Sequence, residues 1–428
     1  MGHRSLSRQV GIPGALLLGL GSMIGTGVFI SLAFAMEVAG NGIFIAILLA
    51  GLLAMCNGLS SAQLAAVHPV SGGTYEYGYR FLTPALGFLA GWMFLVAKSA
   101  SAATAALGFS AYIIHVAGLN LSVWLVPMAW LIVLLLTLVA WLGLRRTNMA
   151  NAILLTCTLG GLALFVIAAF WNEPIGLVDG PAPLAGSWKQ IGYAAALVFV
   201  AFTGYGRVAT LGEEIRNPAK SIPVAVVITV LITLGLYLCV AAACVHVAGT
   251  TGTAAAFDQN AAALAVLASE HLGVGFGLAV TCAAATAMLG VLLNLMVGLS
   301  RIVLAMARRH DLPIGLAQLN EDRTSPTHAV LAVSAVLLCW VSLGEIRLVW
   351  SLSALTVLVY YGVTNLAALR IPRELRRLPR LVPLTGLAGC AALALMIEGG
   401  AWRLGGVIAG LGMIAFWLNQ SVFRRQAL

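Results

Sequence analysis

The stretch GSMIGTGVFI (Gly21–Ile30) lies inside a long apolar run near the N-terminus. Seven consecutive positions of this stretch hold three glycines, one serine and one threonine. A glycine in a helix interior costs about 1 kcal/mol relative to alanine. A backbone amide left unpaired in lipid is costlier still. We therefore expect a membrane helix that is broken around Gly25, Thr26 and Gly27, with the freed backbone groups available to bind a ligand.

The composition is that of an integral membrane protein. The 428-residue chain is 61% hydrophobic and 9% charged, with a mean hydropathy of +1.01. Soluble domains usually contain about 25% charged residues. A bilayer core needs about 20 apolar residues for each helix that crosses it. We predict an all-α polytopic membrane protein with about twelve such segments, which begin near residues 15, 43, 84, 122, 149, 190, 224, 274, 329, 348, 383 and 402. We expect no cleaved signal peptide.

The basic residues predict the orientation. With the N-terminus inside and twelve helices, 18 of the 23 lysines and arginines fall on the cytoplasmic side. Only Lys189, Arg347 and Arg403 fall on the opposite side, and Lys98 and Arg207 lie within predicted spans. We therefore interpret the net charge of +9 as a sign of topology and not of nucleic-acid binding. This distribution predicts a protein of the cell inner (plasma) membrane, with both termini cytoplasmic.

Enzymatic signatures are missing from the sequence. All seven cysteines lie in apolar segments without metal-ligand spacing, so we interpret them as small core residues. Nucleophile elbows, phosphate loops and zinc motifs are also missing. We therefore expect neither enzymatic activity, nor a cofactor, nor a metal site.

A second interrupted segment lies in the other half of the chain. The stretch FVAFTGYGRVATLGEE (Phe199–Glu214) carries Gly204 and Gly206 in the sixth predicted helix. Transporters are often built from inverted repeats, in which interrupted helices at corresponding places form the binding site. With five helices per repeat, helix six corresponds to helix one. An alternative is that Gly21 and Gly25 form a Gly-x-x-x-Gly helix-packing face, which could coexist with the break.

Four motifs in order resemble the amino acid–polyamine–organocation superfamily. They are GLGSMIGTGVF in the first helix, PVSGGTYEYGYRFLTPALGFLAGW (Pro69–Trp92), EEIRNPAKSIP (Glu213–Pro223) and SRIVLAMARRHDLP (Ser300–Pro313). The resemblance implies a LeuT-type fold of five plus five helices in inverted repeats, with two added C-terminal helices. The first repeat would then cover residues 1–180, the second residues 181–380, and the added helices residues 381–428.

The two breaks suggest how a ligand is held. A broken helix exposes amides with partial positive charge at one new end and carbonyls with partial negative charge at the other. Such an N-terminal end binds anions, and glycine lets the ligand approach closely. We expect the first break to hold a carboxylate and the second an ammonium group, which together recognise an α-amino acid. The candidate residues are Ile24, Gly25, Thr26 and Gly27 in the first break and Phe199, Ala201, Phe202, Thr203, Gly204 and Tyr205 in the second. Lys98 in helix three is a further candidate for substrate binding.

The lack of acidic residues in the predicted spans indicates which substrate side chains the protein selects. No acidic residue lies in the middle of a predicted span, so a cationic substrate would have no counter-charge. The family often has a polar or acidic residue near Gly206, and the bulky aromatic gate of some members is replaced here by Val200. Phe199, Phe202 and Tyr205 would make an apolar, aromatic wall, which favours a neutral amino acid.

Two intramembrane cations and one threonine are candidates for coupling. Several sodium-independent relatives carry a lysine in helix five, where this chain has Thr158. Lys98 or Arg207 could supply that charge and make transport sodium-independent, and Lys98 could exchange protons. Alternatives are that the two cations select acidic substrates, or that Arg207 reaches toward the cytoplasmic side. With no carboxylate at hand, each would rest on backbone carbonyls, water or substrate.

The sequence thus predicts a secondary transporter that moves an amino acid by alternating access, through sodium-independent exchange or proton coupling. Its expected partners are the amino acid, the lipid bilayer and, in the coupled case, protons. An exporter, or a carrier of acidic amino acids, is an alternative in the same class. A channel or a receptor that does not transport is an alternative in another class. We place Glu76 in the loop before helix three, with an interfacial role, and Glu213 and Glu214 at an inner gate or in a solvated loop.

Overall fold

The computed structural model describes residues 11–70, 72–141, 147–172, 187–210, 215, 217–259, 262–319 and 326–426. Within these ranges the chain is almost entirely helical, which confirms the predicted all-α class. The helices are α1 (Ile12–Met23), η1 (Gly27–Ser31), α2 (Leu32–Ala39), η2 (Gly40–Gly42), α3 (Ile43–Val67), α4 (Thr74–Phe81), α5 (Pro84–Ala117), α6 (Leu121–Trp141), α7 (Thr147–Trp171), α8 (Trp188–Phe202), α9 (Tyr205–Thr210), α10 (Pro218–Gln259), α11 (Ala263–Leu272), α12 (Val274–Arg308), η3 (Ile314–Ala317), α13 (Thr327–Ser342), α14 (Ile346–Leu369), η4 (Arg373–Leu375), α15 (Leu381–Met396) and α16 (Gly399–Gln426).

Nine stretches among the described residues are long and apolar enough to cross a membrane, which makes this an integral membrane protein. One of them, Ile12–Val67, holds 56 residues and contains both the broken first helix and α3. Two further apolar helices, α13 and α15, have 16 residues each and fall short of the usual length. The count of twelve crossing helices therefore stays a prediction.

The helix starts follow the sequence signals. Eleven of the twelve predicted segments have a helix that begins within about three residues of the expected position. The exception is α10, which begins at Pro218, earlier than expected, because a proline is well suited to the first turn of a helix. Its 42 residues include the non-helical Gly249 (φ 63°), so α10 is two helices joined at a kink.

The broken helices lie at the centre of the molecule. In the span formed by α8 and α9, 89% of the most apolar window is buried, compared with 22% for α6 and for α16. Because α6 is strongly apolar yet exposes Trp130, Leu131 and Leu134, we place it against lipid. The core helix α5 packs against α12 and α14, and α8 packs against α2, α3 and α15.

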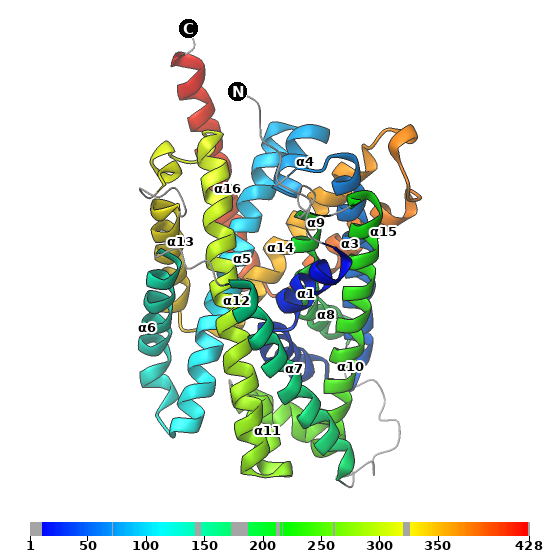
Figure 1. The fold of residues 1–428 in the computed structure, drawn as a ribbon, viewed down its shortest axis with the longest axis vertical. Helices are drawn as coiled ribbons and strands as arrows, with labels where there is room; N and C mark the ends of the chain where they lie inside the picture. Colours follow the sequence, from blue (N-terminus) through cyan, green and yellow to red (C-terminus); the bar gives the residue numbers. More distant parts are fainter. Residues whose placement is uncertain are drawn as a thin grey trace.

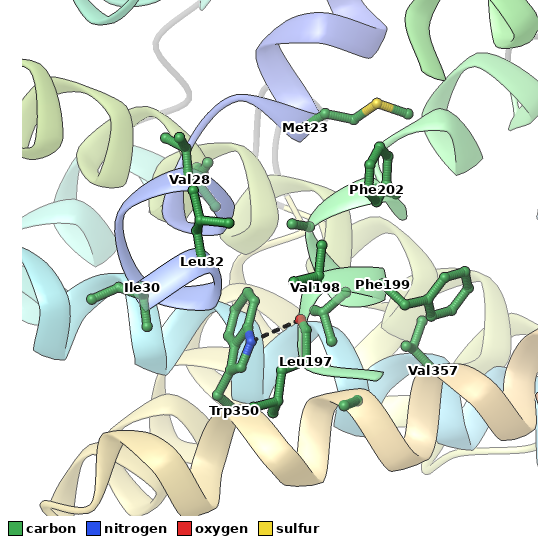
Figure 2. Packing of buried hydrophobic residues seen from close by; sticks show 14 of the residues in the cluster. Met23, Val28, Ile30, Leu32, Leu197, Val198, Phe199, Phe202, Trp350 and Val357 are labelled. Carbon is green, nitrogen blue, oxygen red and sulfur yellow. Dashed lines mark hydrogen bonds between the residues drawn. The ribbon is translucent and has the colours of Figure 1, made fainter. Parts of the chain in front are cut away.

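The packing around α8 fixes the second half of the broken first helix. The Leu197 carbonyl of α8 accepts a hydrogen bond from Ser31 Oγ (2.7 Å). It accepts another from Trp350 Nε1 (3.1 Å), which Figure 2 shows. Ser31 ends η1 and Trp350 lies on α14. The carbonyl therefore ties η1 and α14 to the same turn of α8.

The two ends of the molecule differ. The short helix α4 and the last turns of α16 lie at one end, and α11 lies at the other (Figure 1). Thr74 of α4 meets Thr364, near the end of α14, with their hydroxyl oxygens 2.7 Å apart. The opposite end of α14 carries Arg347, about 25 Å away along the helix.

Candidate substrate site at two helix breaks

The first break lies where the glycine cluster predicts it. Helix α1 ends at Met23, and Ile24 adopts an extended conformation (φ −85°, ψ 90°). Helical geometry resumes at Thr26, and residues Gly27–Ser31 form a π-helical turn before α2. The amides just after the break are at the start of a helical segment, where they have no partner within the helix.

Two of the glycines at this break are required by close contacts. A Cβ on Gly25 would lie 2.3 Å from Val291 Cγ2, and one on Gly27 would lie 2.4 Å from Ala201 Cβ. A Cβ on Gly21 would meet only Leu155 Cδ2, at an ordinary 3.9 Å. The predicted tight packing face thus applies to Gly25 and not to Gly21.

The second break separates α8 from α9. Thr203 caps α8, and its amide donates to the Val200 carbonyl (3.1 Å) in place of the Phe199 carbonyl that a continuing α-helix would use. The turn then continues through Gly204, whose carbonyl accepts from the Arg207 amide (3.0 Å). The last carbonyls of α8 thus lie at a helix end with partial negative charge.

The two breaks touch each other. A Cβ on Gly204 would lie 2.7 Å from the Ser22 carbonyl oxygen, at the end of α1. Gly27 meets Ala201 of α8 on the other side of the first break. In Figure 2, Met23 at the end of α1 lies near Phe202 of α8, and Val28 lies on the second half of the broken helix.

One hydroxyl at the first break has an unmet hydrogen-bonding capacity. Thr26 is 2% exposed, and its Oγ1 has no hydrogen-bond partner within the described residues. The Met23 carbonyl across the break accepts from Tyr237 Oη (2.8 Å). A buried hydroxyl without a partner costs about 1–3 kcal/mol. The free Thr26 hydroxyl is therefore a candidate ligand contact, in line with its predicted role.

The predicted aromatic wall is divided between two neighbours. Phe199 and Tyr205 both pack against Tyr361 of α14. The centre of the Tyr361 ring lies 5.8 Å from that of Phe199 and 5.3 Å from that of Tyr205. Phe202 packs instead against Tyr237 of α10, at 5.1 Å. The structure thus brings Phe199 and Tyr205 together and directs Phe202 elsewhere. Sequence reasoning missed Tyr237, because a single tyrosine in an apolar span carries no signal of its own.

The two intramembrane cations have different partners. Lys98 Nζ donates to Thr203 Oγ1 (2.7 Å), so it rests on a side-chain hydroxyl at the second break. Arg207 Nη2 donates to the Asn294 carbonyl of α12 (3.2 Å), which agrees with the expected support by backbone carbonyls. Thr158 donates to the Leu154 carbonyl (2.8 Å), next to α12. These hydrogen bonds thus join Lys98 to the second break, and join Arg207 and Thr158 to carbonyl groups of other residues.

Two further polar side chains of α14 bond to neighbouring helices. Tyr361 Oη donates to the Thr203 carbonyl (3.3 Å), which puts this residue at the second break. Asn365 Nδ2 donates to Asn57 Oδ1 (2.7 Å), which joins α14 to α3. The predicted gate residues Glu213 and Glu214 lie outside the described residues.

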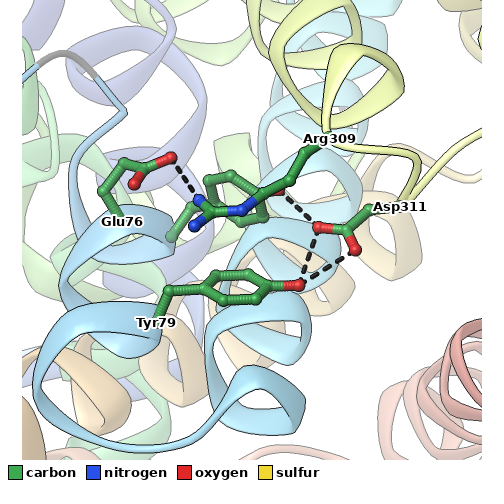
Figure 3. Close-up of polar contacts among 5 residues, drawn as sticks. Glu76, Tyr79, Arg309 and Asp311 are labelled. Atoms are coloured by element: carbon green, nitrogen blue, oxygen red, sulfur yellow. Dashed lines mark hydrogen bonds and ion pairs between the residues drawn. The ribbon is translucent and has the colours of Figure 1, made fainter. Parts of the chain in front are cut away.

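A polar cluster forms at the end of the molecule that carries α4. Arg309 pairs with Glu76 (2.7 Å) and lies over the Tyr79 ring, while the Tyr75 and Tyr79 hydroxyls donate to Asp311 (Figure 3). Burial, together with the hydrogen bond to Asp311, raises the pKa of both tyrosines above the usual range. Glu76 thus lies on a helix and not in a loop, and it links α4 to the end of α12.

The opposite end is bridged by a second ion pair. Arg347, in the first turn of α14, pairs with Glu37 near the end of α2. The Arg347 guanidinium also lies 5.3 Å from the Phe34 ring centre. This pair joins the second half of the broken first helix to α14.

Comparison with known proteins identifies the family of this chain. The model of the family described as "Amino acid permease" matches residues 14–402, which include both breaks. The chain belongs to this family. The resemblance to the amino acid–polyamine–organocation superfamily is therefore confirmed, and the permease is a transporter and not an enzyme.

Relatives of the permease carry transporter names. An uncharacterized transporter of Mycobacterium tuberculosis is 38% identical over 98% of this chain and 93% of its own length. The branched-chain amino acid permease BcaP of Bacillus subtilis is 27% identical over 92% of this chain and 87% of its own. The vacuolar cationic amino acid transporter 2 of Arabidopsis thaliana is 24% identical over 88% of this chain and 62% of its own.

Proposed function

We propose that this permease is a sodium-independent secondary transporter of neutral amino acids. It binds the zwitterion between the two helix breaks and carries it across the membrane by alternating access. The proposal depends on one observation above all: the two breaks pack directly on each other through Gly27, Ala201, Gly204 and Ser22. A carboxylate at the first break and an amino group at the second would then lie a few ångströms apart, as they do in an α-amino acid.

The polar groups at the breaks support this binding mode. The amides around Gly25 and Gly27 begin a helical segment and favour an anion. The unpartnered Thr26 hydroxyl adds a donor within the same turn. The end of α8, with the freed Phe199 carbonyl, favours a cation.

The surroundings of the breaks favour a neutral side chain. Phe199, Tyr205, Tyr361 and Val291 present apolar surface next to the breaks, and in the described part of the chain neither ion pair lies there. BcaP, which is named for branched-chain amino acids, is one of the relatives. Leucine, isoleucine and valine are therefore the first substrates to test.

The fold that we propose is the LeuT type, with five helices in residues 1–180, five in residues 181–380 and two more in residues 381–428. The match between the broken helices α1–α2 and α8–α9 supports this repeat, because they are first in their respective halves. We further propose residence in the cell inner membrane with both termini cytoplasmic.

The test is transport by the purified protein in liposomes. We expect uptake of radiolabelled leucine, isoleucine or valine that does not change when sodium is replaced by choline. Comparison with and without internal amino acid, and with and without a pH gradient, separates exchange from proton coupling. Uptake restricted to glutamate and aspartate would instead favour the acidic-substrate alternative, since Lys98 contacts the second break. Uptake that requires sodium would contradict the proposed coupling.

A further inference from the structure

The feature that carries a further inference is the place that Lys98 occupies. Lys98 lies in the middle of α5, a helix of 34 residues, and reaches Thr203, the residue that caps α8. Its Nζ donates to Thr203 Oγ1 (2.7 Å), and that hydroxyl donates in turn to the Val200 carbonyl (2.6 Å). The lysine cation is thus connected to the end of α8 by a chain of two hydrogen bonds.

This contact takes the place of a carboxylate partner. Within the described residues the two ion pairs join Glu37 to Arg347 and Glu76 to Arg309, and neither includes Lys98. A lysine within a membrane span needs a partner of opposite charge or an equivalent dipole. The C-terminal end of a helix carries about half a negative charge, and α8 ends at this point. The helix end is therefore the counter-charge of Lys98.

The same helix end is the one that the proposed function assigns to the substrate's amino group. Two cations cannot share one helix end a few ångströms apart, because they repel each other. Arg207, in the following helix α9, adds a further positive charge four residues after Thr203. Lys98 and the substrate's amino group are hence alternative partners of the α8 end.

The aromatic ring of Phe94 offers Lys98 a second place to bind after it leaves Thr203. Its Nζ lies 5.9 Å from the centre of the Phe94 ring, one turn earlier on α5. Cations are attracted to the face of an aromatic ring at about this distance. The Phe94 ring is itself held against Tyr360, at 5.0 Å.

We infer that Lys98 takes the place of the substrate's amino group in the empty protein. The Lys98 ammonium and the substrate's amino group bind in turn to the end of α8. This inference rests on the proposed function. When substrate is present, its amino group displaces Lys98. When substrate has left, Lys98 pairs with the helix end again, so the empty protein keeps the same charge arrangement and can change its orientation. Lys98 is then a positioning residue that permits net transport and not only exchange.

The test compares net uptake with exchange in liposomes. Net uptake is measured without internal amino acid, exchange is measured with the same amino acid inside, and the equilibrium Kd is measured on the detergent-solubilised protein. In Lys98→Met we expect the ratio of net uptake to exchange to fall about tenfold or more. We also expect about 10- to 100-fold tighter amino acid binding, the gain that follows if Lys98 holds the site in about 90–99% of molecules. Lys98→Arg, which keeps the charge, should retain a larger ratio than Lys98→Met.

The controls separate this inference from the proposed function. Lys189→Met makes the same substitution at an exposed residue near the start of α8 and should leave ratio and Kd at wild-type values. Lys98→Gln removes the charge but keeps a polar side chain, and it serves if the Met variant is not monodisperse. The inference would be overturned if the neutral variants bound amino acid more weakly than the wild type, or if net uptake and exchange fell equally in them. It would also be overturned if the wild-type protein exchanged amino acid but showed no net uptake. Wild-type protein that transports no amino acid would instead refute the proposed function.

Discussion

Replacing Gly27 by alanine should force the two helix breaks apart. The new Cβ would lie 2.4 Å from Ala201 Cβ, 2.6 Å from Tyr237 Oη and 3.0 Å from Ala201 Cα. Carbon atoms in favourable contact are about 3.5–4.0 Å apart, so η1 and α8 must separate by about 1 Å. Because one of the obstructing atoms belongs to the backbone of α8, a rotamer change cannot relieve the overlap.

The size of the effect follows from the cost of overpacking. Extra methyl groups in a packed core cost about 1–3 kcal/mol. If this cost falls on the arrangement that binds substrate, the apparent affinity drops by about 5- to 160-fold. If it falls on the whole fold, thermal stability drops while the affinity of the remaining folded protein is kept.

The assay is amino acid binding and exchange in liposomes, together with thermal unfolding in detergent. Gly21→Ala, in the other half of the broken first helix, is the matched control, since its Cβ meets only Leu155 Cδ2 at 3.9 Å. The control should match the wild type in binding and be neutral or slightly stabilising, because alanine is the better helix former. Wild-type affinity and stability in Gly27→Ala would refute the close contact between the breaks.

Three further predictions concern other contacts. Thr26→Val should raise thermal stability, because it removes a buried hydroxyl without a partner, and should weaken amino acid binding; a stable variant with wild-type Kd would contradict the ligand contact. Glu37→Gln and Arg347→Gln should each cost about 0.2–1 kcal/mol of stability, and the double variant that combines them should lose less than the sum of the two; fully additive effects in this double-mutant cycle would contradict the pair. The pKa of Tyr79 is raised in the folded state, so the stability that its hydroxyl contributes should be constant below about pH 10, the pKa of an unfolded tyrosine, and be lost above that value. Melting of wild type and Tyr79→Phe across pH should show a constant difference up to that point, and a difference that disappears near neutral pH would contradict the contact with Asp311.

The breaks could be predicted because their cause is local. Glycine clusters inside apolar runs weaken a helix at that place, whatever surrounds it. The sequence therefore located the ends of α1 at Met23 and α8 at Phe202 to within a few residues. It did not reveal the π-helical turn at Gly27–Ser31, which depends on how η1 packs against α8.

Contacts between distant residues could not be predicted. Lys98 and Thr203 are 105 positions apart, and nothing in either local sequence indicates that α5 and the end of α8 lie together. The same holds for Tyr79 and Asp311, 232 positions apart, whose cluster the sequence did not suggest. Phe202 was assigned to a common wall with Phe199 because helical spacing gives approximate faces, and the neighbours of each face decide the actual partner.

The most direct test of the account is an experimental structure of the permease with a transported neutral amino acid bound. We predict density between the two breaks, with the carboxylate within hydrogen-bonding distance of the Gly25–Gly27 amides and the amino group at the end of α8 near Phe199 and Thr203. An amino acid bound elsewhere, or a continuous helix through Thr26 or through Gly204, would contradict the account.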